Sequence, residues 1–230
     1  MKTLGLLGGM TWHSTVDYYR LINAGVQERL GGSHSAELLL LSIDFVPVEK
    51  MQERGDWAGM GRLMGEWARR LEDAGAEGLV ICTNTMHRLA DDIARAIRIP
   101  IIHIADATAV AVKRAGLDTV GLLGTRYTME LDFYRGRLET SHGLKVLVPD
   151  EAGRTLVHDV IYKELTYGTI RDESRAAYVE IIEDLRRRGA QGVILGCTEI
   201  PLLVKQKDSP LPVFDTTALH AAAAVEFALG

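Results

Sequence analysis

Short apolar runs alternate with longer amphipathic stretches along the whole chain. The amphipathic stretches, such as 57–75 and 174–190, carry apolar residues at every third or fourth position and end in glycine, as surface helices do. The apolar runs are typical of buried parallel strands and cover 3–7, 37–43, 78–82, 100–104, 118–123, 144–148, 191–196 and 211–214. Strand and helix in regular alternation predict an α/β protein with parallel sheets.

Two segments of the chain recur later in the sequence in similar form. "GAEGLVICTNT" (75–85) matches "GAQGVILGCTE" (189–199) at an offset of 114 residues, and "GLLG" occurs at 5–8 and again at 121–124, an offset of 116. A lone "GLLG" would suit the end of any buried strand, but two matches at nearly one offset favour an internal duplication. We therefore expect two pseudo-symmetric lobes, each a four-stranded parallel sheet flanked by helices, with the active site in the cleft between the lobes.

Composition excludes several classes of protein. The 230 residues are 47% hydrophobic and 25% charged with a formal net charge of -5, which gives no electrostatic reason to expect nucleic acid. The opening "MKTLGLLGGMTW" is too short an apolar run for a signal peptide, and no later segment approaches a membrane span. The only cysteines, Cys82 and Cys197, lie far apart and form no C-x-x-C motif. Reduced thiols in the cytoplasm fit this pattern best.

The expected strand ends are rich in glycine, threonine, asparagine and serine. They read "GGMTW" (8–12), "SIDF" (42–45), "CTNTMH" (82–87), "GTRYTM" (124–129) and "GCTEI" (196–200). Residues of these types cap helices and expose backbone N–H groups, so five converging turns favour a small carboxylate ligand, although plain capping explains any one threonine. The candidate binding residues at these ends are Met10, Asn84, Thr85, Thr125, Tyr127, Thr128 and Thr198.

Two other kinds of site are disfavoured. "GLLGGM" lacks the G-x-G-x-x-G spacing and the G-K-[ST] ending of nucleotide loops. The seven histidines include no pair at i, i+4 and no cluster with a cysteine, so we expect no metal. His87 lies one helical turn beyond Cys82 and is better suited to orienting a loop.

Cys197 stands between an expected buried strand and "TEIP", where Pro201 suits the first turn of a helix. A thiol at a helix N-terminus has its pKa lowered from about 8.5, so we predict a reactive cysteine; a small apolar core residue is the alternative. Glu199 could orient Cys197 or a substrate ammonium group, or cap the helix.

Together "GLLGGMTW", "TNTMH", "LLGTRYTM" and "GCTEI" resemble the aspartate/glutamate racemase family over the whole chain. The resemblance implies a cofactor-independent amino-acid racemase, usually a homodimer, with one acid/base on each face of the substrate α-carbon. In this family the lobes exchange their last elements. We therefore expect a first lobe of 1–98 plus 210–230 and a second lobe of 99–209.

One position departs from the family pattern, in which a catalytic cysteine stands immediately before "N-T-x-H". That position is Thr83 here, and the internal repeat also sets Thr83 opposite Cys197 and Cys82 opposite Gly196. Three interpretations follow, in order of preference. Thr83 and Cys197 are the two acid/bases, with Thr83 relayed through Asn84, His87 or water; or a bulged loop lets Cys82 reach in; or Cys197 works alone in a lyase or isomerase of small carboxylic acids.

A second carboxylate on the substrate would need a polar or cationic partner. Arg54, Arg126, Lys163 and Arg171 are the candidates, and Lys163 and Gln52 lie where relatives contact the distal group of the substrate. Solvated helix faces are an equally good interpretation of these residues. A non-catalytic carboxylate-binding protein is the alternative function, although the intact "GCTE" argues against it.

Overall fold

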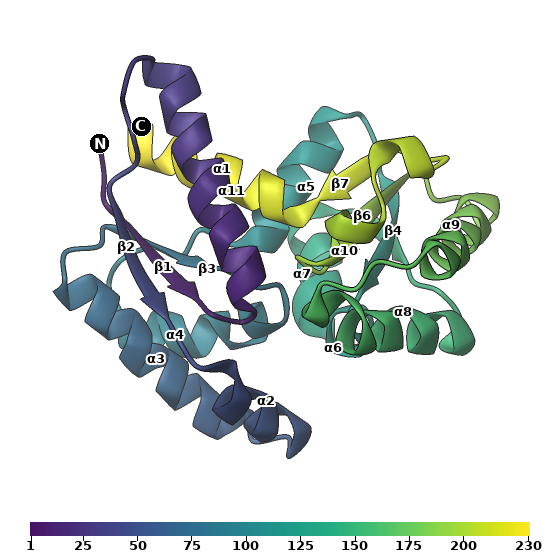
Figure 1. The fold of residues 1–230 in the computed structure, drawn as a ribbon, viewed down its shortest axis with the longest axis horizontal. Helices are drawn as coiled ribbons and strands as arrows, with labels where there is room; N and C mark the ends of the chain where they lie inside the picture. Colours follow the sequence, from purple (N-terminus) through teal and green to yellow (C-terminus); the bar gives the residue numbers. More distant parts are fainter. The chain divides into compact units, whose positions relative to one another are not determined.

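The computed structural model describes all residues, Met1–Gly230. The chain divides into two compact units, the first made of Met1–Ile104 with His220–Gly230 and the second of Ala105–Leu219. Each unit contains one parallel sheet flanked by helices (Figure 1). The predicted α/β class with two related parallel sheets is therefore confirmed. None of the helices is both long and apolar enough to cross a membrane.

The sheet of the first unit has three parallel strands in the order β2-β1-β3. Their bounds are β1 Leu4–Gly8, β2 Leu38–Ser42 and β3 Gly78–Ile81. The prediction of four strands was wrong for this sheet: the expected last strand, 211–214, pairs in the other sheet, and the run 100–104 contributes only an isolated bridge between Leu79 and Ile101. Pro100 has no N–H to donate to a ladder, and a helix already begins at Ile104, so no strand has room to form.

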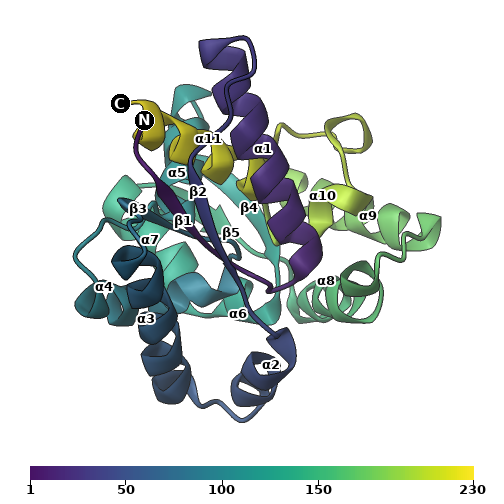
Figure 2. The same ribbon diagram turned by 60° about the vertical axis from the view of Figure 1, so that its left-hand side comes forward.

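Both faces of this sheet are covered by helices (Figures 1 and 2). Apolar residues of α1 pack with Leu4 and Leu6 on one face, together with alanines of the C-terminal helix α11. Leu7 points to the other face, where residues of α3 and the segment after β3 enclose it. The helical elements of this part are α1 Trp12–Leu30, α2 Phe45–Glu53, α3 Trp57–Asp73, η1 Thr85–Leu89, α4 Ala90–Ala96 and α11 Thr216–Leu229.

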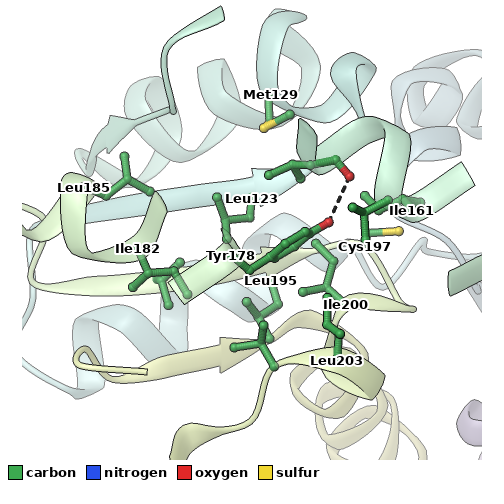
Figure 3. Packing of buried hydrophobic residues seen from close by; sticks show 14 of the residues in the cluster. Leu123, Met129, Ile161, Tyr178, Ile182, Leu185, Leu195, Cys197, Ile200 and Leu203 are labelled. Carbon is green, nitrogen blue, oxygen red and sulfur yellow. Dashed lines mark hydrogen bonds between the residues drawn. The ribbon is translucent and has the colours of Figure 1, made fainter. Parts of the chain in front are cut away.

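The sheet of the second unit has four parallel strands in the order β5-β4-β6-β7. The number of strands is as predicted, but β7 takes the place expected for the run 100–104. Its central strand β4 is flanked by β5 and β6, and one core joins Leu123 and Leu195 to Tyr178 and Ile182 (Figure 3). The strands are β4 Thr119–Gly124, β5 Lys145–Leu147, β6 Gly192–Gly196 and β7 Val213–Asp215. The helical elements are α5 Ile104–Arg114, α6 Arg126–Glu130, α7 Asp132–His142, α8 Glu151–Lys163, η2 Leu165–Tyr167, α9 Asp172–Arg187, α10 Ile200–Leu203 and η3 Gln206–Asp208.

The duplication read from the sequence recurs in the geometry of equivalent turns. After α3, Gly75 has φ +103° and its N–H donates to Glu72 O at 2.9 Å. After α9, Gly189 has φ +101° and its N–H donates to Arg186 O at 3.0 Å. A positive φ strains any residue with a Cβ, which explains why both copies end these helices with glycine.

The division of the chain differs from the predicted one near the C-terminus. We expected both the last strand and the last helix to join the first lobe. Instead β7 pairs with β6 in the sheet of the second unit, and only His220–Gly230 groups with the first. Each half of the chain has a helix that is divided between the two units. α5 groups with the second unit from Ala105 onward, and α11 groups with the first unit from His220 onward.

His220 on α11 is the one histidine of its helix and is completely buried. Its Nε2–H donates to Ile102 O at 2.5 Å, and its Nδ1 accepts from the Tyr18 hydroxyl at 2.8 Å. Burial lowers the pKa of this imidazole from 6.5 to about 4. The folded protein therefore holds His220 neutral where the unfolded chain would take up a proton.

This burial predicts a specific pH dependence of stability. Below pH 6.5 the unfolded chain binds a proton that the folded chain refuses until about pH 4, so the free energy of unfolding falls as the pH falls through that window. The total loss attributable to His220 is about 3 kcal/mol. Urea titrations at several pH values should show this slope, and His220→Gln should flatten it. His34→Gln, which removes a histidine from an exposed site, is the matched control. An unchanged slope in His220→Gln would contradict the assignment.

Candidate active site

The first group of candidate residues follows β3. Leu7 pairs with Ile81, so β1 and β3 reach the same edge of the sheet together. The N–H of Cys82 extends the ladder by donating to Leu7 O at 2.9 Å, and the N–H of Thr83 then turns back to Ile81 O at 2.8 Å. The chain therefore turns sharply between Cys82 and Thr83, where the strand ends and η1 begins at Thr85.

Cys82 faces the interior of the first unit. Its side chain has no exposed surface and belongs to the core formed by α1, α11 and the sheet. The thiol lies 3.8 Å from Val80 O, and burial raises its pKa far above the usual range. A thiol in this position is neutral and is packed as an apolar group.

Thr83 lies on the other side of that turn and is 8% exposed. Its carbonyl oxygen accepts from His87 Nδ1 at 2.8 Å, so His87 binds the backbone of Thr83 and not its hydroxyl. Asn84 and Thr85 are buried beside it. His87 orients the loop, as the sequence suggested, and its contact with a carbonyl gives the Thr83 hydroxyl no imidazole base.

The second group lies at the equivalent edge of the other sheet, where Gly124 pairs with Gly196. A Cβ on Gly124 would lie 2.7 Å from Gly196 O, and one on Gly196 would lie 2.9 Å from Leu123 O. Only glycine permits these two strand ends to approach so closely. The turn after β4, which carries Thr125, therefore starts beside the turn that carries Cys197.

Thr125, directly after β4, caps the short helix α6. Thr125 Oγ1 accepts from Thr128 N at 3.4 Å and lies 3.2 Å from Thr128 Oγ1. Both side chains are buried, whereas Tyr127 is partly exposed and its ring stands edge-on to His158. The capping interpretation considered for Thr125 is thus observed. Capping does not prevent Thr125 from also contacting a ligand.

Cys197 follows β6 and its thiol is held by a carboxylate. The Cys197 Sγ–H donates to Glu199 Oε2 at 3.0 Å, and the Thr198 hydroxyl donates to the same oxygen at 2.8 Å. All three side chains are buried, with Cys197 7% exposed. In Figure 3 the Cys197 sulfur points away from Tyr178, whose hydroxyl donates to Val157 O at 2.9 Å.

The prediction of a lowered pKa for Cys197 was wrong. Burial, and after it the negative charge of Glu199, raise the pKa of this thiol well above its ordinary value. The backbone N–H groups of Thr198 and Glu199 do lower it, as expected at a helix start, but burial and the carboxylate outweigh them. The helix α10 is only four residues long, which limits its dipole. Cys197 therefore rests as a neutral thiol.

The remaining sequence candidates lie in more varied surroundings. Met10 is part of the core on the α3 face, and Gln52 is buried on α2. Lys163 ends α8 with its side chain 72% exposed and paired with Asp159 Oδ2 at 2.8 Å. Asp44, in the segment after β2, caps α2 by accepting from Val46 N at 3.1 Å.

The sequence analysis missed the buried pair of His220 and Tyr18. The signal was present in "ALHAAAAV", where one polar residue interrupts an otherwise apolar helix face. No group of three or more His, Cys, Asp and Glu side chains is placed to hold a metal ion.

Comparison with known proteins assigns the chain to a family. The model of the Asp/Glu/hydantoin racemases matches residues 7–224, so the chain belongs to the Asp/Glu/hydantoin racemase family. A crystal structure of an Asp/Glu racemase candidate from Yersinia pestis is 54% identical, with a TM-score of 0.95 and full coverage of both chains.

Two further relatives are informative. The crystal structure of an aspartate racemase homologue from Pyrococcus horikoshii OT3 is 35% identical with a TM-score of 0.85, again over 100% of both chains. The broad specificity amino-acid racemase RacX of Bacillus subtilis (strain 168) is 22% identical over 223 residues, which is 96% of each chain. The resemblance to the aspartate/glutamate racemases is thereby confirmed.

Proposed function

We propose that this protein is a cofactor-independent amino-acid racemase that acts on aspartate, glutamate or a similar amino acid. The observation that carries the proposal is the hydrogen bond from the Cys197 thiol to Glu199 at the end of a central strand. Family membership supports amino-acid racemase activity, and the names of the Pyrococcus and Bacillus relatives support it further.

Cys197 is suited to proton transfer at the α-carbon. Because its pKa is raised, the thiol is protonated at neutral pH and can deliver a proton to a carbanion directly. In the opposite direction it must first lose that proton, and Glu199 Oε2 already accepts the thiol hydrogen at 3.0 Å. We propose that Glu199 takes up this proton, which would make Cys197 the base for one enantiomer.

Inversion of the α-carbon requires a second group that acts on the opposite face. The internal repeat sets Thr83 in the position equivalent to Cys197. The burial of Cys82 among core side chains supports Thr83, because a sulfur packed against Val80 and α1 would have to leave the core to reach a substrate. A hydroxyl is a much weaker acid than a thiol, so we expect unequal rates for the two enantiomers.

Stabilisation of the intermediate falls to hydrogen-bond donors at the strand ends. Removal of the α-proton leaves an enediolate-like anion, which needs donors directed at the substrate carboxylate. We assign this role to Asn84, Thr85, Thr125 and Thr198. We assign binding of the distal substrate carboxylate to Lys163 and Gln52. The ion pair of Lys163 with Asp159 is exposed and contributes little to stability, so Lys163 can exchange it for a substrate carboxylate.

A one-cysteine lyase or isomerase of small carboxylic acids is the second candidate. The binding of His87 to the Thr83 carbonyl favours it, because the hydroxyl then has no imidazole to activate it. In this alternative Cys197 alone would exchange protons with the substrate. The homodimer implied by the family and a cytoplasmic location stay predictions.

Deuterium exchange tests the proposal. The protein is incubated in D₂O with each enantiomer of aspartate and glutamate, and loss of the α-proton signal is followed by NMR. We expect exchange from both enantiomers together with racemisation. Exchange from one enantiomer alone, without racemisation, would favour the one-cysteine alternative. Binding of dicarboxylates that raises the melting temperature, with no exchange at high protein concentration, would show a non-catalytic binding protein.

A further inference from the structure

His87 makes two hydrogen bonds that define the state of its ring. Its Nδ1 lies 2.8 Å from Thr83 O, and its Nε2 lies 3.2 Å from Ile104 N. A carbonyl oxygen can only accept and a backbone N–H can only donate, so Nδ1 carries the proton and Nε2 is the acceptor. His87 is therefore neutral, and it links the carbonyl of Thr83 to the segment that leads into α5 at Ile104.

That segment is itself held by a second buried histidine. His220 Nε2 donates to Ile102 O at 2.5 Å, two residues before the N–H that binds His87. The centroids of the His87 and His220 rings are 5.4 Å apart, and the His103 ring lies 4.6 Å from His87. His87 thus links Thr83 to the segment 102–104, which His220 holds in place independently.

The peptide groups around Thr83 are consequently fixed on both sides. On the N-terminal side, Cys82 N donates to Leu7 O at 2.9 Å and Thr83 N donates to Ile81 O at 2.8 Å. On the C-terminal side, the Thr83 carbonyl is held by His87, which is buried and cannot exchange this partner for water. With the backbone fixed, the threonine Cβ can project its hydroxyl in only a few directions.

We propose that His87 is a positioning residue for Thr83: it acts through the Thr83 carbonyl to hold the hydroxyl at the place where proton transfer occurs. The proposal rests on the racemase function proposed above. It assigns His87 no proton-transfer step, because neither ring nitrogen is bonded to the hydroxyl. A displacement of a reacting group by about 1 Å can lower a rate by about 100-fold, so loss of this bond should be visible in kinetics.

Two substitutions separate the two hydrogen bonds. In His87→Asn the side-chain amide N–H can replace Nδ1–H and keep the bond to Thr83 O. In His87→Gln the longer side chain can place its carbonyl oxygen near the position of Nε2 and keep the bond from Ile104 N. Both variants remove the imidazole, so they serve as matched controls for each other.

The readout is the exchange of each enantiomer measured separately in D₂O. The enantiomer whose exchange is lost in Thr83→Val reports on Thr83, and the other reports on Cys197. We expect His87→Gln to slow the Thr83-dependent exchange by about 100-fold and His87→Asn to slow it by about threefold or less. The Cys197-dependent exchange should change little in either variant.

Equal slowing of both exchanges, in step with a lowered melting temperature, would show a structural role only and overturn the proposal. Wild-type exchange in His87→Gln would overturn it as well. If the unmodified protein exchanges neither enantiomer, the proposed function fails instead. The two failures are therefore distinguishable.

Discussion

Cys197→Ala is expected to abolish racemisation, with a fall in rate of about 10²- to 10⁴-fold, the range found when a general acid–base group is removed. The reason is the thiol proton, which rests on Cys197 because burial and Glu199 raise the pKa. Alanine has no exchangeable side-chain proton, and the substitution changes the side-chain volume only slightly. Racemisation followed by polarimetry, together with exchange of each enantiomer in D₂O, measures the loss.

Cys82→Ala is the matched control for that experiment. It removes the other thiol of the chain from a fully buried position and leaves the strand-end hydrogen bond of its backbone to Leu7 in place. We expect activity close to that of the unmodified protein and a small loss of stability. An inactive Cys82→Ala protein that still folds would mean that the buried thiol reaches the substrate, which is the bulged-loop interpretation.

Thr83→Val is expected to slow racemisation by a comparable amount, about 10²- to 10⁴-fold. Valine has almost the shape of threonine, so the turn after β3 should be kept while the hydroxyl is lost. Exchange of one enantiomer should disappear, and exchange of the other should persist because Cys197 is intact. This one-sided loss distinguishes a proton-transfer role from general damage to the site.

Thr83→Ser is the control that keeps a hydroxyl at the same carbon. It should retain a large part of the exchange that Thr83→Val loses. If Thr83→Val racemises its substrate at the original rate, Thr83 is not an acid/base, and the second group must be sought elsewhere. If Thr83→Val keeps all measured exchange and no racemisation occurs even in the unmodified protein, the chain works with Cys197 alone.

Local signals in the sequence predicted most of the strands and helix ends. Runs apolar on both faces gave the positions of the paired strands, and the glycines at 75 and 189 marked helix ends that share one backbone conformation. The run 100–104 was misjudged because apolar composition does not reveal how little space lies between Pro100 and the helix that begins at Ile104. The placement of β7 depended on its partner strand, which no local pattern specifies.

The identity of the candidate site residues could be predicted from the internal repeat. Their pKa values and hydrogen bonds could not, because these depend on contacts that form only in the folded chain. Thr83 and Cys197 could be found because the repeat sets them in equivalent places. The pKa of Cys197 could not, because it is governed by burial and by a carboxylate that turns back onto the thiol. The bond from His87 to Thr83 O spans one turn, but its second bond joins it to Ile104, seventeen residues away.

The path of the chain has a consequence for biosynthesis. Ala105–Leu219 forms one uninterrupted unit, whereas the first unit is assembled from both ends of the chain. During translation the second unit can be complete once residue 219 has left the ribosome. The sheet face covered by α1 lacks Ala221, Ala224 and Val225 until the last helix is made, so the first half of the protein to be synthesised is the last to bury its core.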